Sequence, residues 1–232
     1  QAYSSIYGIY VNTSFYYYIT ETISVRVYES RIDLMRAVVI GQQGTPYHGG
    51  LFFFDVCFPS DYPNSPPLVH YDSGGLGINP NLYKCGHVRF NLPNTSGGQE
   101  PMWVHGTSTM LQLLVSIQNW ILNANPLFND FTYAITQGSP FGEQSSRLYN
   151  ENTHIKSLKT MVYIMNKPPK NFEDFIAIHF RNGAREIVRV AFARKNCSVM
   201  YQDDLFSCLN PLYMAFKKMG AKDNQLSNWR KP

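Results

Sequence analysis

Side chains that can do chemistry gather in one short stretch of the chain, residues 78–89. It holds the amide of Asn81, the thiol of Cys85 and the basic groups of Lys84, His87 and Arg89. A thiol can attack a carbonyl carbon through its ionised fraction, whereas a guanidinium stays protonated and has no lone pair to offer. Arg89 therefore cannot act as a nucleophile, and Cys85 is the one thiol in the stretch.

The basic residues of this stretch allow two interpretations. His87 and Arg89 alternate with Val88, which places both side chains on the same side of an extended segment. With Lys84 they form a basic surface that either contacts an anion or acidic peptide or has no selected role.

The four cysteines of the chain limit its chemistry further. Cys57, Cys85, Cys197 and Cys208 form no C-x-x-C pair and no cluster with histidines. We therefore expect no metal and no other cofactor, and a reducing compartment, the cytoplasm or the nucleus. Cys57 lies in a strongly apolar segment, which predicts a core thiol.

Composition indicates a globular protein. Of 232 residues, 44% are hydrophobic and 16% are charged, enough apolar content for a sizeable core. The net charge of +4 is too small to predict nucleic-acid binding, and no stretch has the length and apolarity of a membrane span. The positive excess lies in residues 209–232, as a solvated tail or a docking patch for an acidic partner.

Strands are predicted before helices. Alternating or β-branched apolar runs predict four strands, at residues 23–28, 34–40, 51–58 and 68–71. Their short connections favour an antiparallel meander. The next segment, residues 72–107, is rich in Gly, Pro and Asn and reads as a long irregular loop.

Apolar residues at helical spacing predict helices in the second half. The first is capped by Ser108 and ends before Asn125, and residues 127–144 form an irregular link. A second, capped by Ser145 or Ser146, runs to Met165. Asn171 caps a third, which ends near residue 194, and a short one covers residues 212–219. The fold class is therefore α+β, a four-stranded meander packed on helices.

Three motifs in register resemble the ubiquitin-conjugating enzyme family. Residues 58–67 read F-P-S-D-Y-P-N-S-P-P, similar to the family's F-P-x-x-Y-P-x-x-P-P, and Asn79-Pro80-Asn81 follows where the family has its His/Asn-Pro-Asn turn. Trp103 and the helix from Ser108 come next in the same order. The sequences of four segments are similar to those of the large plant enzymes, namely residues 28–34, 44–48, 108–112 and 157–163. Those plant enzymes share a branch with the animal hybrid conjugating/ligase enzymes.

This resemblance covers roughly residues 21–190 and suggests a division of the chain. We expect an atypical Tyr-rich segment (1–20), a conjugating-enzyme core domain (21–140), family-specific C-terminal helices (141–195) and a basic tail with a short helix (196–232).

The resemblance also implies roles for individual residues. The family's thioester-forming Cys comes eight residues after the last Asn of the turn, and here that position is Arg89. Asn81 matches the Asn that steadies the oxyanion or its loop, although it can also merely close a Pro-Asn turn. Cys85 lies four residues early, as a replacement nucleophile or an incidental loop residue. Contacts with RING-type ligases are implied for Phe58, Pro59, Tyr62, Pro63, Pro66, Asn125 and Pro126.

Two segments depart from the family pattern. Related plant members carry Leu-Leu-Asn-Thr-Trp after the Cys, where this chain has Leu92-Pro93-Asn94-Thr95-Ser96. Residues 1–19 are Tyr-rich and β-prone, and they lack the amphipathic stripe of the helix that helps to engage the activating enzyme. Loading by that enzyme is thus doubtful on a second ground.

Two functions follow from these observations. The first is a pseudoenzyme that binds ubiquitin, a ligase or another conjugating enzyme without forming a thioester. The second is an active conjugating enzyme, in which Arg89 is a variant, an engineered change or an error of the gene model. For the sequence as it stands we favour the first.

Overall fold

The computed structural model describes residues 17–93, 99–101, 103–193 and 197–226. The predictions for residues 1–16, for the Ser96 position and for the last six residues lie outside this part of the chain.

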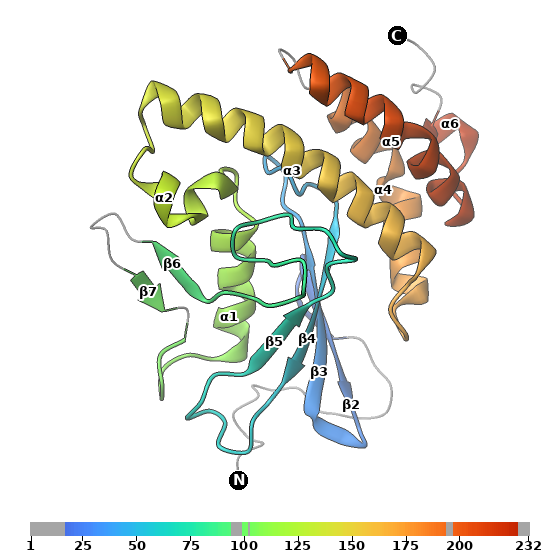
Figure 1. The fold of residues 1–232 in the computed structure, drawn as a ribbon. Coiled ribbons are helices and arrows are strands. Elements are labelled where there is room, and N and C mark those ends of the chain that lie inside the picture. The colour runs from blue at the N-terminus through green and yellow to red at the C-terminus, as the bar shows by residue number, and fades with distance from the viewer. Residues whose placement is uncertain (1–16, 94–98, 102, 194–196, 227–232) are drawn as a thin grey trace.

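Five strands form one antiparallel sheet in chain order (Figure 1). They are β1 (Tyr17–Thr20), β2 (Ile23–Tyr28), β3 (Arg31–Ile40), β4 (Leu51–Cys57) and β5 (Leu68–Tyr71). The predicted four-stranded meander is confirmed in β2 to β5, and β1 adds an edge strand. Cys57, predicted as a core thiol, is only partly buried because β4 ends there.

Helices and one small hairpin complete the fold. The hairpin pairs β6 (Asn91–Pro93) with β7 (Gln99–Pro101). The helical elements are α1 (Met110–Ser116), the π-helical turn η2 (Ile117–Ile121), the 3₁₀ turn η3 (Pro126–Asn129), α2 (Phe131–Ala134), α3 (Pro140–Asn166), α4 (Glu173–Ala193), α5 (Val199–Lys218) and α6 (Asp223–Leu226). No helix within these residues is both long and apolar enough to cross a membrane.

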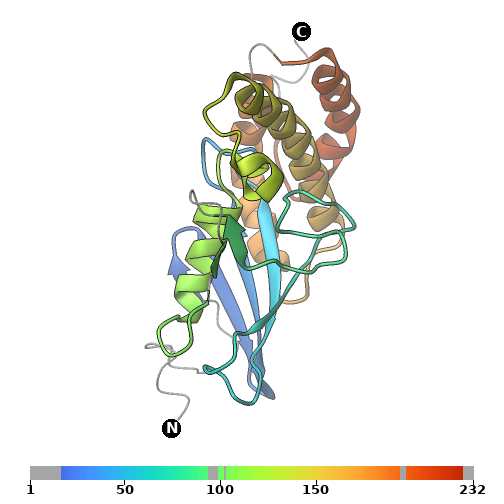
Figure 2. The ribbon, with the colours of Figure 1, turned by 60° about the vertical axis from the view of Figure 1, so that its left-hand side comes forward.

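Helices cover both faces of the sheet (Figures 1 and 2). Successive residues of a strand point to opposite faces, and β3 and β4 are apolar at consecutive positions. Val39 and Phe52 pack with α1 and η2 on one face. Val38 and Phe53 pack with α3, α4 and α5 on the other, so the C-terminal helices share a core with the sheet.

Three predicted helix starts need correction. Thr109, rather than Ser108, caps α1, because Thr109 and Gln112 form a reciprocal capping box. Helix α3 begins at Pro140, six residues early, since Ser139 accepts a hydrogen bond from the amide of Gly142 and proline suits the first helical position. Asn171 has φ 70°, a left-handed conformation that does not fit an N-cap.

The predicted short helix at 212–219 is wrong in length, because α5 extends over 20 residues. Pro211 lies inside this helix, although proline is disfavoured there. Ser198 caps the start, and buried apolar side chains repeat at helical spacing and join the core on α3 and α4. They are Tyr201, Leu205, Cys208, Leu212, Ala215 and Phe216.

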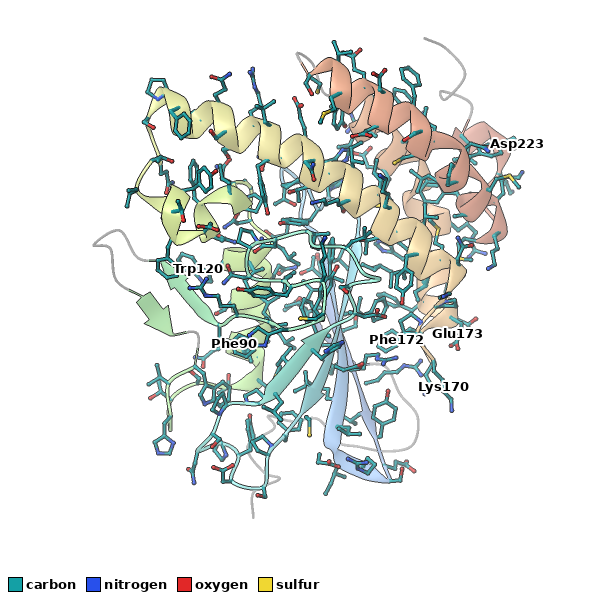
Figure 3. The ribbon with its side chains drawn as sticks, viewed as in Figure 1. Phe90, Trp120, Lys170, Phe172, Glu173 and Asp223 are labelled. Carbon is teal, nitrogen blue, oxygen red and sulfur yellow. The ribbon has the colours of Figure 1, made fainter. Side chains whose placement is uncertain are left out.

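Polar and aromatic contacts fasten α4 to the sheet. Phe172, at the start of α4 (Figure 3), packs edge-on to Phe53 with ring centroids 5.1 Å apart, and the Arg26 guanidinium lies 5.1 Å from the Phe172 ring centroid. Nε2 of His179 is 2.8 Å from the Gly49 carbonyl, in the loop before β4. Burial, with a smaller contribution from nearby His48, lowers the pKa of His179 below its usual 6.5.

We predict that Phe216→Ala lowers the free energy of unfolding by about 3–5 kcal/mol, because it opens a cavity in the core beneath α5. Phe206→Ala, on the same helix but 63% exposed, should change it by less than about 0.5 kcal/mol. Urea titration of both variants measures this, and equal effects would show that α5 does not share the core.

His179 should make stability depend on pH. Its pKa is lower in the folded chain, so below about pH 6.5 the unfolded chain binds the proton more readily. The His179 contribution is therefore complete above pH 6.5 and is lost as the pH falls toward the folded pKa. His179→Gln keeps a donor for Gly49 but does not titrate. Its Tm should drop less between pH 7.5 and 5.5 than that of the parent chain, and parallel drops would refute the assignment.

Candidate active site

The stretch from Asn81 to Arg89 folds as a tight hairpin beside β5. The Arg89 amide donates to the Asn81 carbonyl at 2.9 Å, and the Tyr83 amide donates to the His87 carbonyl at 3.0 Å. Leu82 and Val88 face each other between these pairs, and both are buried. Lys84, Cys85 and Gly86 therefore form the tip, whereas Arg89 lies at the base.

A fully bonded Asn79 anchors this hairpin. Its Nδ2 donates to the Tyr47 hydroxyl at 2.9 Å and to the Ile121 carbonyl at 2.7 Å. Its Oδ1 accepts from the Asn81 amide at 2.8 Å and from Asn129 Nδ2 at 3.5 Å. Two donors and two acceptor positions exhaust the capacity of an amide side chain. Burial also raises the pKa of Tyr47 well above its usual value, so this hydroxyl stays neutral.

Asn81 lies fully buried between the two arms of the hairpin. Its Nδ2 donates to the Arg89 carbonyl at 2.9 Å, which pairs the two residues through side chain as well as backbone. In this geometry Asn81 holds the backbone of residue 89 in place.

Arg89 is partly buried and faces α2. Its guanidinium carbon lies 4.7 Å from the ring centroid of Phe131, the first residue of α2, within range of a cation–π contact. Phe131 is 42 positions from Arg89 in sequence, and nothing in the sequence pattern indicated the pair. The Arg89 side chain is thus a cation held against an aromatic ring.

Cys85 lies at a different level of the hairpin from Arg89. It is exposed at the hairpin tip, whereas residue 89 pairs with Asn81 at the base. Extended backbone rises about 3.3 Å per residue, so the two levels are separated by roughly 10 Å. The near-attack geometry of an acyl transfer tolerates far smaller displacements.

Gly86 shapes the tip of the hairpin. It has φ 89°, and its amide donates to the Tyr83 carbonyl at 2.9 Å. A Cβ at Gly86 would lie 1.9 Å from Cε1 of His70 on β5. Only glycine meets both requirements without rearrangement.

The basic residues of the stretch take different positions. Val88 points into the core, and His87 and Arg89 remain outside it, as their alternation predicted. The His87 ring lies 5.5 Å from that of Tyr83, near the tip. Within the described residues, no three His, Cys, Asp or Glu side chains are grouped as metal ligands would be.

The Phe58–Pro67 segment forms an aromatic cluster at one end of α1. Phe58 and Tyr62 have ring centroids 4.8 Å apart, and Trp103 continues the stack 5.7 Å from Tyr62. Nδ1 of His105 lies 3.2 Å from the Asn64 carbonyl. Pro59, Pro63 and Pro66 belong to the same segment, and Pro63 and Pro66 are exposed.

Asn125 and Pro126 do not join this cluster. They follow η2, whereas Trp103 precedes α1, so the length of α1 and η2 lies between them and the aromatic cluster. Pro126 is buried, and Oδ1 of Asn125 accepts a hydrogen bond from Ser146 at 3.1 Å. Their contacts attach η3 to α3, whereas Trp103 and His105 are the residues that extend the aromatic cluster.

Comparison with known proteins identifies the family of this chain. The family model for ubiquitin-conjugating enzymes matches residues 17–154, more than half of the chain. This chain belongs to the ubiquitin-conjugating enzyme family, and the predicted α+β fold and family resemblance are confirmed.

The relatives include plant proteins and a hybrid enzyme. Probable ubiquitin-conjugating enzyme E2 25 of Arabidopsis thaliana is 58% identical over 177 residues, covering 76% of this chain and 29% of that protein. Probable ubiquitin-conjugating enzyme E2 26 of the same plant is 44% identical, covering 88% and 41%. The dual E2 ubiquitin-conjugating enzyme/E3 ubiquitin-protein ligase BIRC6 of Homo sapiens is 42% identical, covering 69% and 3%. The chain spans less than half the length of each.

We predict that Gly86→Ala lowers the free energy of unfolding by about 2 kcal/mol, because it adds a clash with His70 to the strain of a positive φ. Gly75→Ala is the matched control, since Gly75 has φ 81° and open space around it. It should cost only about 1 kcal/mol. Urea titrations compare the two, and adding His70→Ala should recover the difference. A failure to recover it would contradict the predicted clash.

Proposed function

We propose that this chain is a non-catalytic member of its family, which forms no ubiquitin thioester and acts by binding within the ubiquitin pathway. The observation that carries this proposal is the Arg89 side chain, held against Phe131 at the position that the family reserves for its nucleophile. The supporting geometry around it, above all Asn79 and Asn81, is intact.

The proposal follows from the chemistry of acyl transfer. Ubiquitin passes from the activating enzyme to a thiolate, whose lone pair attacks the thioester carbonyl and displaces a thiol. A guanidinium stays protonated across the physiological range and offers no such pair. The positive charge of Arg89 would also meet the approaching acyl group where a neutral or anionic sulfur is required. Loss of the nucleophile therefore abolishes the reaction even where the surrounding donors remain.

Binding surfaces remain available in a chain without a nucleophile. The aromatic cluster of Phe58, Tyr62 and Trp103 supports contact with a RING-type ligase, because partly exposed aromatic groups are common anchors of interfaces. Ubiquitin or another conjugating enzyme are further partners by family membership. We place the protein in the cytoplasm or the nucleus, where thiols stay reduced.

The hydrogen bonds of Asn79 and Asn81 also support one alternative function, that of an active conjugating enzyme. If the natural sequence has Cys in place of Arg89, the same hairpin would hold a nucleophile beside Asn81, and the protein would be an active conjugating enzyme. Sequencing the transcript across residues 85–98 distinguishes the two.

We predict that Arg89→Cys gains a ubiquitin thioester. After incubation with activating enzyme, ATP and ubiquitin, this variant should show a higher band on a non-reducing gel that disappears with dithiothreitol, because Asn81 still positions the backbone of residue 89. The parent chain should show none.

Two further variants sharpen this result. Arg89→Ala removes the guanidinium without adding a thiol and should not charge, whereas Arg89→Cys combined with Cys85→Ser should charge as fully as Arg89→Cys alone. Charging of the parent chain or of Arg89→Ala would identify another cysteine as nucleophile. Absence of charging in Arg89→Cys would show that more than one residue disables the site.

A further inference from the structure

A groove of about 640 Å³ runs along α3, and Arg89 is not among the residues that line it. Leu148, Asn152 and Lys156 form its floor, since residues four positions apart share one face of a helix. Tyr133 of α2 forms one wall, and Met200 of α5 forms the other. We call this feature the α3 groove.

One end of the α3 groove is apolar. Leu148 and Met200 are 47% and 67% exposed, and Leu127 and Tyr133 complete this end. Large apolar side chains gathered in a concavity and left in contact with water are typical of interaction sites. This end therefore offers a place for two or three apolar side chains of a partner.

The other end is basic. Lys156 lines the groove, and Lys159 follows one turn along the helix. The hairpin tip lies against this part of α3, since the Ser73 hydroxyl donates to the Lys84 carbonyl at 2.6 Å and Tyr163 of α3 donates to the neighbouring Asp72 at 3.2 Å. Lys84 is close enough there for its charge to act on Lys156, although it does not line the groove. Figure 1 shows this loop beneath the middle of α3.

Lys84, Lys156 and Lys159 keep their charges unpaired in the part of the chain that the structure describes. None of them belongs to an ion pair among the described residues. Burial, followed by the charges of Lys84 and Lys159, lowers the pKa of Lys156, as expected for like charges held together. An acidic partner would relieve this repulsion.

Two carboxylates lie in the groove. Glu151 is buried and accepts hydrogen bonds from the amide and hydroxyl of Ser198, so it is already satisfied. Asp204 stands on the α5 wall and places negative charge on that side. Acidic groups of a partner are therefore expected on the hairpin side of the floor, next to Lys84 and Lys156.

We propose that the α3 groove binds a segment of a partner protein in which apolar side chains are followed by a run of Asp and Glu. The apolar residues occupy the end between Tyr133 and Met200, and the acidic run lies over Lys84, Lys156 and Lys159. Charge complementarity commits the site to an acidic segment, and the apolar end distinguishes it from a site for a free anion or a nucleic acid. Arg89 takes no part, so the proposal stands whether or not the chain forms a thioester.

Binding of such a segment can be measured by fluorescence anisotropy with the full chain. The labelled peptide has about 14 residues, in which Leu, Phe and Met at helical spacing precede four Glu. Two control peptides replace either the apolar residues by Ser or the Glu residues by Gln. We expect the first peptide to bind, each control to bind at least about tenfold more weakly, and the affinity to fall with salt.

Matched variants locate the site. Lys156→Gln with Lys159→Gln should weaken binding by about tenfold, whereas Lys167→Gln with Lys170→Gln makes the same charge change beyond the groove and should alter it by less than about twofold. Figure 3 shows Lys170 near the start of α4. Met200→Ser should weaken binding, and Met214→Ser, equally exposed on α5 but outside the groove, should not.

Several results would overturn the proposal. They are no binding of any peptide, equal effects of the groove and control variants, and equal binding of the Ser-substituted peptide. Equal competition by single-stranded DNA would show a general polyanion surface instead. Circular dichroism melts of all four variants confirm that each is folded before its affinity is compared.

Discussion

The side-chain amide of Asn79 joins the active-site hairpin to the helices and to the loop before β4. Each of its four hydrogen bonds reaches a different segment: the loop before β4, the end of η2, the hairpin and η3. All of these groups are buried, and each would cost about 1–3 kcal/mol if left without a partner. Asn79 therefore determines where the hairpin lies, and the hairpin in turn determines where Asn81 and residue 89 lie. On our proposal, the hairpin keeps the place of the family's nucleophile without the nucleophile itself.

The C-terminal helices are held to the sheet by buried apolar side chains. Alternate residues of β3 and β4 supply two separate cores, so the sheet supports α1 on one face and α3, α4 and α5 on the other. This second core places α5 alongside α3, and the two helices together with α2 create the α3 groove. Helix α5 lies beyond the residues that the family model matches, and it adds one wall of the α3 groove, with Lys84 of the hairpin tip nearby.

Local pattern predicted much of the fold, and its failures have physical causes. Alternation identified β2 to β5, and motif spacing singled out Asn81 and Arg89, which the structure pairs in one hairpin. The part of α5 before Leu212 was missed. Proline usually ends a helix, but α5 continues through Pro211 because Tyr201 and Leu205 pack into the shared core. The contact of Arg89 with Phe131 and the separation of Asn125 from the Phe58 cluster depend on tertiary packing, which no local spacing records.

The central claim is that the architecture of a conjugating enzyme persists here without its chemistry. The most direct test is the intact mass of the unmodified 26.6 kDa chain after incubation with activating enzyme, ATP and ubiquitin, measured without reductant. We predict that the mass stays that of the free chain, while an active conjugating enzyme in a parallel reaction gains one ubiquitin. A gain of one ubiquitin that dithiothreitol reverses, mapped to Cys85 or Cys57, would contradict the claim.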